Sequence, residues 1–252
     1  MMTTTEIARI ADAIRARQSF VISSHARPDG DAIGSQLAMA YALRALGKDV
    51  RVVNRDPAPP PLMAFAGVPD IEIAPKVDGD FDAAIIMECG DLTRTGVEGL
   101  DRGFVINIDH HPGNTGYGQI NWFDPAAAAC GEMVYDLVVG LGVLLTAEIA
   151  THVYVAILTD TGSFRFSNIT PRTFDICRAL LEAGVDPVSV SRSVYDSGTM
   201  ARLKLSGALL SDMQIDPTGR IAMLYLDQEM ARAAGGTYED TDGLINEPLT
   251  VK

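Results

Sequence analysis

The sequence is poor in positive charge, in aromatic residues and in cysteine. It has 20 Lys and Arg against 33 Asp and Glu among 252 residues, which gives a formal net charge of −13. An acidic chain has no overall attraction for the phosphates of long duplex nucleic acid, although a metal ion or a few arginines can still bind a small anion. Because only 6% of the residues are aromatic, base-stacking surfaces cannot be abundant.

Cysteine usage and hydrophobic run length indicate where the protein works. Cys89, Cys130 and Cys177 are odd in number and far apart, which excludes a disulfide framework and a CxxC metal knuckle. Free thiols are typical of the cytoplasm. No apolar run reaches the ~20 residues of a membrane span, and residues 1–18 are amphipathic, without the continuous apolar core of a secretion signal. We therefore expect a cytoplasmic protein with no membrane partner.

Apolar runs and helical patterns alternate along the first 185 residues. The runs at 82–87 and 104–108 are almost continuously apolar, as is typical of strands buried on both faces of a parallel sheet. The alternation predicts an α/β fold, a parallel sheet with helices on both faces. The predicted strands are 20–23, 49–54, 82–87 and 104–108, and the predicted helices are 5–18, 32–46, 130–141, 147–157 and 171–183.

The pattern changes after residue 185. Two strand-like runs, 211–216 and 220–226, flank the turn Pro217-Thr218-Gly219, which predicts an antiparallel hairpin. We expect a first domain at 1–185, a linker at 186–199 and a smaller α/β domain at 200–252. The last ten residues end on an apolar run with no closing element, so we expect this second domain to be incomplete and the chain to be truncated.

Four clusters of acidic or histidine residues follow apolar runs. They are HARPDGD at 25–31, ECGD at 88–91, DHH at 109–111 and DTG at 160–162. Each cluster alone has an ordinary explanation as a turn. Together they suggest more, because the carboxyl ends of parallel strands lie along one edge of a sheet, and ligands bind there.

The composition of the clusters favours a metal centre. Three of the four histidines of the chain fall within them. Carboxylates gathered in one crevice repel one another unless a cation neutralises them, and mixed carboxylate and imidazole ligands suit a divalent ion such as Mn²⁺. Two such ions about 3.5–4 Å apart can hydrolyse phosphoesters. The residues therefore predict a metallohydrolase.

Four motifs occur in order across residues 20–170: HARPDGDAIGS, IIMECGD, INIDHH and AILTDTGSFRFS. On these motifs the chain resembles the DHH phosphoesterase superfamily, named after the Asp-His-His triplet seen here at 109–111. It is most similar to the small bacterial oligoribonucleases that also dephosphorylate the adenosine bisphosphate pAp. The region after residue 200 resembles the start of the DHH-associated C-terminal domain, and in this branch the two lobes enclose the site.

The resemblance implies two metal sites, with Mn²⁺ as the expected ion and Mg²⁺ as the alternative. Asp109 would orient a histidine, His111 would reach the scissile phosphate, and a hydroxide bridging the metals would attack it. His25 and Asp29 would hold one ion, Asp31, His110 and Asp160 the second, and Glu88 would bridge both.

Arg27, Arg94 and Arg165 lie in or beside the motifs. Each is expected either to neutralise phosphate charge or to form a surface salt bridge, and the sequence leaves both open. The expected partners are short RNA or a nucleotide. The oligomeric state also stays open, with a homodimer as one option.

Two departures from the family pattern bear on function. Glu88 stands where the family usually has Asp, and a glycine-rich motif ending in histidine, which grips the substrate in the family's C-terminal domain, does not occur before residue 252. Three alternatives therefore remain: a hydrolase of pyrophosphate, of a cyclic dinucleotide or of single-stranded DNA. A fourth is a degenerate member that binds nucleotide without catalysis. The chain has neither a phosphate-binding P-loop nor a Gly-x-Ser-x-Gly elbow, which argues against a P-loop nucleotidase and a serine hydrolase.

Overall fold

A computed structural model describes residues 3–241 and 243–250. The chain forms two compact units, 1–194 and 195–252. The predicted linker, 186–199, contains a helix whose Val190 belongs to the core of the larger unit. The predicted domain limits stay a prediction.

The described part of the larger unit begins with a helix, a strand and a helix, and continues with a run of strands and then a run of α-helices. The elements are α1 (Thr3–Arg15), β1 (Ser19–Ser23), α2 (Gly30–Ala45), β2 (Asp49–Asn54), β3 (Glu72–Ile73), β4 (Ala83–Met87), β5 (Phe104–Asp109), β6 (Ile120–Phe123), α3 (Cys130–Gly140), α4 (Ala147–Asp160), α5 (Pro171–Glu182) and α6 (Pro187–Tyr195).

The six strands form one sheet in the order β3-β2-β1-β4-β5-β6, and every pairing in it is parallel. The predicted parallel sheet is confirmed. From β1 the chain extends the sheet in one direction through β2 and β3, and from β4 it extends it in the other through β5 and β6. The boundary between β1 and β4 is thus the switch point of the topology, where ligands bind in open α/β sheets.

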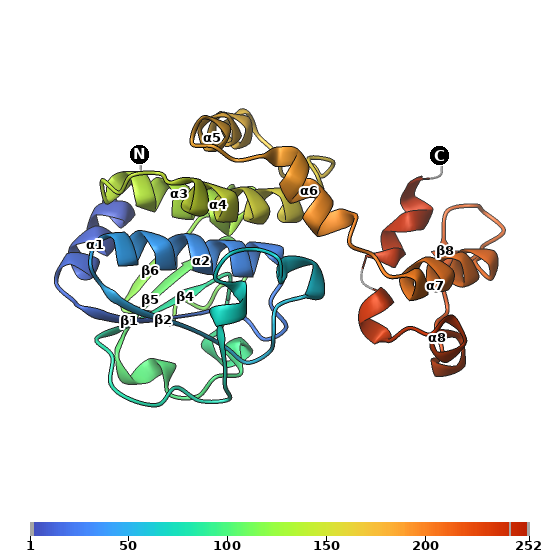
Figure 1. Ribbon diagram of the computed structural model, residues 1–252, viewed down its shortest axis with the longest axis horizontal. Coiled ribbons are helices and arrows are strands. Elements are labelled where there is room, and N and C mark those ends of the chain that lie inside the picture. The colour runs from blue at the N-terminus through green and yellow to red at the C-terminus, as the bar shows by residue number, and fades with distance from the viewer. Residues whose placement is uncertain (1–2, 242, 251–252) are drawn as a thin grey trace. The chain divides into compact units, whose positions relative to one another are not determined.

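Both faces of the sheet are covered, but by different kinds of helix. Phe20 and Ile22 of β1 face a core shared with the α-helices, which lie on one side of the sheet in Figure 1. Val21 faces the opposite side, where loops and the short 3₁₀ helices η3 (Leu92–Thr95) and η4 (Leu100–Arg102) cover the strands. The predicted helices on both faces are confirmed, with 3₁₀ helices alone on the second face.

Two glycines allow α2 and α4 to pack closely. A Cβ built on Gly34 would lie 2.5 Å from the carbonyl oxygen of His152, and one built on Gly30 would lie 2.4 Å from the Cγ2 of Thr159. Real Cβ atoms do not approach other atoms so closely, so only glycine fits at these positions. The two helices meet along this seam for most of their length.

The smaller unit is a short helical unit with a hairpin. The predicted antiparallel hairpin is confirmed as β7 (Gln214–Ile215) paired with β8 (Ala222–Met223). The small core consists of Leu205, Leu209 and Leu244. The other described elements are α7 (Met200–Ser211), α8 (Gln228–Ala234), η5 (Tyr238–Thr241) and η6 (Leu244–Thr250).

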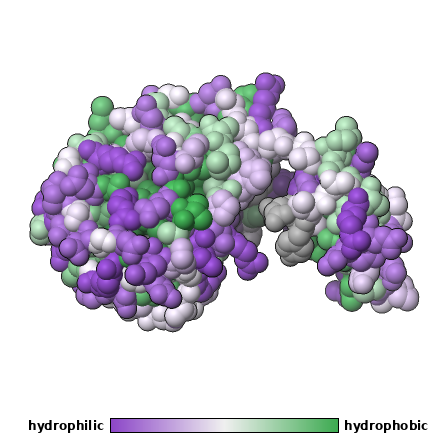
Figure 2. Space-filling view, turned by 60° about the horizontal axis from the view of Figure 1, so that its bottom comes forward, coloured by the Kyte–Doolittle hydropathy of each residue, from purple (hydrophilic) through white to green (hydrophobic). Residues whose placement is uncertain are grey.

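The visible surface of the larger unit is mostly hydrophilic, although the share of charged residues in the chain, 21%, is ordinary for a folded protein. Figure 2 shows hydrophilic residues over most of the visible face of the larger unit, around a small apolar area at its centre. Among the described residues, the helices are all too short or too polar to cross a lipid bilayer.

We expect Gly34→Ala to destabilise the larger unit although alanine is the better helix former. Helix propensity favours alanine by about 1 kcal/mol, but the added methyl group would push α2 away from α4, at a cost of about 1–3 kcal/mol. Gly207→Ala in α7 is the matched control, because nothing lies within 4 Å of its added Cβ, and it should stabilise its own unit. Thermal unfolding measures both. A G34A protein at least as stable as the wild type would contradict the tight seam.

Candidate metal centre

The site lies at the carboxyl edge of the sheet, around the switch point. His25 follows β1, Glu88 follows β4, and Asp109 ends β5 with His110 and His111 directly after it. These segments are neighbours because β1 pairs with β4 and β4 pairs with β5. Three of the four predicted clusters therefore meet as expected.

Helix α2 begins inside the site. Asp29 is its N-cap and accepts a hydrogen bond from the backbone N–H of Ala32 (3.0 Å). Asp31, in the first turn, is 1% exposed. Its carboxylate accepts hydrogen bonds from the backbone N–H groups of Cys130 (2.6 Å) and Gly131 (3.1 Å), at the start of α3. The N-termini of two helices thus stabilise its negative charge.

The fourth cluster reaches the site from a helix. Asp160 is the last residue of α4, so the prediction that all four clusters follow strands of the sheet was wrong for this one. The apolar run before it is part of the predicted helix 147–157, which continues to residue 160. The contact between Gly30 and Thr159 brings the end of α4 beside the start of α2. Asp160 therefore faces the same crevice as Asp31.

His110 is at the centre of the cluster. Its Nε2 lies 3.3 Å from Glu88 Oε1, 3.6 Å from Asp160 Oδ2 and 3.8 Å from Asp31 Oδ2. Burial disfavours a charged imidazole, but the hydrogen bond to Glu88 and the charges of Glu88 and Asp31 raise the pKa of His110 to about 10. At neutral pH and without a metal, the proton on His110 supplies positive charge among these carboxylates, as a bound cation would.

Glu88 has the least satisfied side chain of the site. It is 1% exposed, and neither carboxylate oxygen has a hydrogen-bond donor at ideal geometry among the described residues, although two imidazoles face it. Burial and the charge of Asp31 raise the pKa of Glu88 well above its usual value. Its backbone is in the left-handed region, with φ of 55°, a strained conformation that clusters at functional sites.

His25 and Asp29 form a second group beside the first. His25 Nε2 lies 3.7 Å from Asp29 Oδ2. The charge of Asp29 contributes to the pKa shifts of Asp31, Glu88 and Asp160, so it acts on the same crevice. Burial and the charge of Asp31 raise the pKa of Asp160 to about 6.

The donor set fits divalent cations. The Nδ1 of His25 lies 2.9 Å from the carbonyl oxygen of Ala26, and the Nδ1 of His110 lies 3.0 Å from that of Ala127. A carbonyl only accepts, so each Nδ1 carries the hydrogen, and a neutral ring then presents the Nε2 lone pair to the crevice. The possible metal-binding atoms lie within 4.8 Å of one another in each of two sets of residues. One set is Glu88, His110 and His111, and the other is Asp31, His110 and Asp160.

Asp109 holds His111, as expected for a residue that orients a histidine. Asp109 Oδ1 lies 3.0 Å from His111 Nδ1 and also accepts from the backbone N–H of His111 (3.2 Å). His111 Nδ1 is also 3.2 Å from Glu88 Oε1. Asn114, which was not among the predicted site residues, donates to Asp109 Oδ2 at 2.6 Å. Its only signal was its place three residues after the triplet.

The three arginines differ in their surroundings. The Arg27 guanidinium makes no hydrogen bond or ion pair with the described residues, and the residue has φ of 53°. Burial disfavours the charged ring of His25, but its contact with Asp29 raises its pKa. The charge of Arg94 opposes this rise, so Arg94 acts on the edge of the crevice. Arg165 Nε donates to the carbonyl of Gly162 (2.7 Å). None of the three forms a salt bridge within the described chain.

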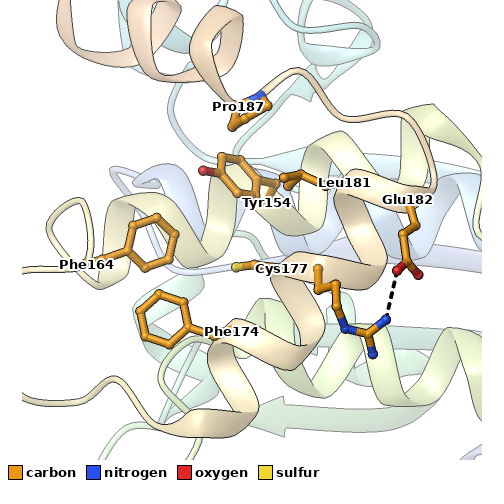
Figure 3. A pocket seen from close by; sticks show the side chains of 8 residues that line it. Tyr154, Phe164, Phe174, Cys177, Leu181, Glu182 and Pro187 are labelled. Carbon is orange, nitrogen blue, oxygen red and sulfur yellow. Dashed lines mark hydrogen bonds and ion pairs between the residues drawn. The ribbon is translucent and has the colours of Figure 1, made fainter.

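The loop after Asp160 is anchored away from the crevice. Phe164 stacks on Phe174, with ring centroids 5.6 Å apart, and lies near Tyr154. Figure 3 shows these rings and Cys177 around an apolar hollow beside α5. The Asn168 amide donates to the carbonyls of Asp160 (3.1 Å) and Ala128 (2.8 Å). The hollow is therefore a support for this loop, separate from the polar crevice.

Comparisons with solved structures agree with this architecture. An exopolyphosphatase-related protein from Bacteroides fragilis superimposes with a TM-score of 0.92 at 26% identity, covering 98% of this chain and 77% of that one. A putative family II inorganic pyrophosphatase from Methanococcus jannaschii shares the fold, with a TM-score of 0.59 at 18% identity, covering 92% of this chain and 79% of that one.

Sequence comparisons place the chain in a family. A bifunctional oligoribonuclease and PAP phosphatase, NrnA, of Thermus thermophilus is 35% identical over 94% of this chain and 70% of its own length. The protein of the same name from Bacillus subtilis is 25% identical over 96% of this chain and 76% of its own length. The profile of the DHH family, N-terminal domain, matches residues 19–157. With its Asp-His-His triplet in the crevice, this chain belongs to the DHH family of phosphoesterases.

Proposed function

We propose that this chain hydrolyses short oligoribonucleotides and the adenosine bisphosphate pAp, using two divalent cations, with Mn²⁺ as the preferred ion. The observation that carries the proposal is the convergence of carboxylates and imidazoles around the buried carboxylate of Glu88, which faces the rings of His110 and His111. Two relatives that are named oligoribonuclease and PAP phosphatase support the choice of substrate.

The residues present divide between two cation positions. His25 and Asp29 would hold one ion, Asp31, His110 and Asp160 would hold the other, and Glu88 would bridge them. When bound, the two cations would supply positive charge for the phosphate and would lower the pKa of a bound water toward neutrality, so that it becomes a nucleophile for phosphorus.

The remaining side chains would act on the substrate. His111, whose side chain is 38% exposed and contacts Asp109, would donate a hydrogen bond to the scissile phosphate. Arg27, whose guanidinium has no partner within the described chain, and Arg94, whose charge reaches His25, would neutralise further phosphate oxygens. Arg165 is proposed for the same role because it follows Asp160 by five residues.

A hydrolysis screen tests the function. With Mn²⁺, we expect release of phosphate from pAp and cleavage of a ribodinucleotide, and no comparable activity on pyrophosphate or a cyclic dinucleotide. Preference for pyrophosphate or a cyclic dinucleotide would replace the proposed substrate within the same family. Binding of pAp without release of phosphate, in the presence of bound Mn²⁺, would make the chain a nucleotide-binding protein without catalysis.

Substitution of Glu88 tests the bridging role. Glu88→Gln keeps the shape but removes the charge between two cations, so at least one Mn²⁺ should bind more weakly and kcat for pAp should fall by about 10²-fold or more. Glu88→Asp restores the usual family residue and should keep or raise activity. Calorimetric Mn²⁺ titration and phosphate release measure both variants. Full activity and two tightly bound ions in E88Q would contradict the bridging role.

Uptake of Mn²⁺ at pH 7 should release protons. Without metal, the pKa of His110 is about 10, above the 6.5 of a free imidazole, so its ring is protonated at pH 7 and must lose that proton to bind a cation. Mn²⁺ affinity should therefore rise with pH up to about 10. Titration calorimetry in buffers of different ionisation enthalpy measures the protons released.

The E88Q variant is the control for this proton. Without the charge of Glu88, the pKa of His110 should fall and fewer protons should be released on Mn²⁺ binding. Equal proton release by wild type and E88Q, or none by the wild type, would show that His110 does not bind the cation in competition with a proton.

A further inference from the structure

A fully buried asparagine lies in the middle of strand β5, which pairs with β4 and β6. Asn107 is 1% exposed and has apolar neighbours on its own strand, Ile106 and Ile108. A buried amide is costly unless its hydrogen bonds are satisfied. Asn107 belongs to the motif INIDHH, but it is none of the residues expected to hold a cation or to contact the substrate.

The Asn107 amide nitrogen holds the chain on both sides of Glu88. Its Nδ2 donates toward the carbonyl of Ile86 (3.2 Å) and that of Cys89 (3.1 Å). Glu88 lies between these two carbonyls, in the left-handed conformation that turns the chain at the end of β4. The two hydrogen bonds therefore favour the turn that directs the Glu88 carboxylate into the crevice.

The oxygen of the same amide is connected to His111 through two further side chains. Asn107 Oδ1 accepts from Asn114 Nδ2 (2.7 Å), and Asn114 Nδ2 also donates to Asp109 Oδ2 (2.6 Å). Asp109 in turn holds His111. A single buried side chain thus connects the strand end that carries Glu88 with the loop that carries His111.

Tyr117 closes this network. Its hydroxyl accepts from Asn107 Nδ2 (2.8 Å) and donates to the carbonyl of Cys89 (2.9 Å). The two N–H hydrogens of the Asn107 amide are thus shared among three acceptors, the carbonyls of Ile86 and Cys89 and the Tyr117 hydroxyl, and its Oδ1 accepts from Asn114. An asparagine whose only role was to complete its own hydrogen bonds in the core would not need partners both beside Glu88 and in the loop after His111.

We propose that Asn107 is a positioning residue that fixes the Glu88 carboxylate relative to His111, and so sets the spacing of the two cations. The proposal rests on the proposed two-cation function. Without the hydrogen bonds from Asn107 to the carbonyls on either side of Glu88, the turn at Glu88 can relax toward ordinary extended backbone. The carboxylate then leaves the position in which it faces both His110 and His111.

Asn107→Leu tests the proposal, because leucine has a similar size and makes no hydrogen bond. Asn54→Leu is the matched control: Asn54 is also fully buried, on β2 of the same sheet, and its amide pairs with that of Gln36 (2.7 and 3.0 Å). Both variants lose buried hydrogen bonds and stability. If leucine prevents folding, Asn107→Ser and Asn54→Ser take their places.

The readouts are the electron paramagnetic resonance spectrum of the Mn²⁺-loaded proteins and kcat for pAp. We expect N107L to lose the exchange-coupled signal of a closely spaced Mn²⁺ pair and to lose about 10- to 100-fold in Mn²⁺ affinity or kcat, as is usual for groups that orient metal ligands. N54L should keep the coupled signal and the wild-type kcat.

The outcomes separate the two proposals. A wild type that binds no coupled Mn²⁺ pair and does not cleave pAp overturns the proposed function, and the role of Asn107 with it. A wild type that does both, with an N107L variant that matches N54L in signal and kcat, overturns the positioning role alone.

Discussion

The rest of the structure depends on the mutual repulsion of carboxylates in one crevice. Asp31 and Glu88 are almost fully buried, and Asp29 and Asp160 act on them electrostatically. Such a group is tolerated only with compensating positive charge. Backbone N–H groups at the start of α3 supply part of it for Asp31, whereas Glu88 relies on two imidazoles. The crevice therefore favours cations, and a proton on His110 takes that role when no metal is bound.

This repulsion has to be opposed by a rigid frame. The glycine seam between α2 and α4 holds Asp31 beside Asp160, and the parallel pairing of β1, β4 and β5 holds the other side chains of the crevice. The backbone carbonyls that accept from His25 and His110 fix the orientation of the rings. Charged groups that are held in place in advance need little reorganisation when a cation or substrate binds, and such preorganisation is the main source of electrostatic catalysis in enzymes.

Most of the fold was predictable because its elements have strong local patterns. The buried strands around residues 85 and 106 and the helix ended by Gly47 were predicted to within a few residues. The strand Ile120–Phe123 was missed, since four residues carry too little pattern. The place of Asp160 was assigned to a strand end because its apolar run resembles a buried strand when the helical periodicity is ignored.

The sequence by itself determined which chemical groups the site contains. Turns after apolar strands, together with the Asp-His-His triplet, predict carboxylates and imidazoles at one sheet edge, because parallel strands end at the same edge. Only the tertiary structure decided how these groups face one another. The approach of Asp160 depends on glycines that fit against α4, and the direction of Glu88 depends on a left-handed turn. The contacts made by Asn107 join residues 7 to 21 positions apart, and no local pattern records such contacts, because they form only when the strands pair.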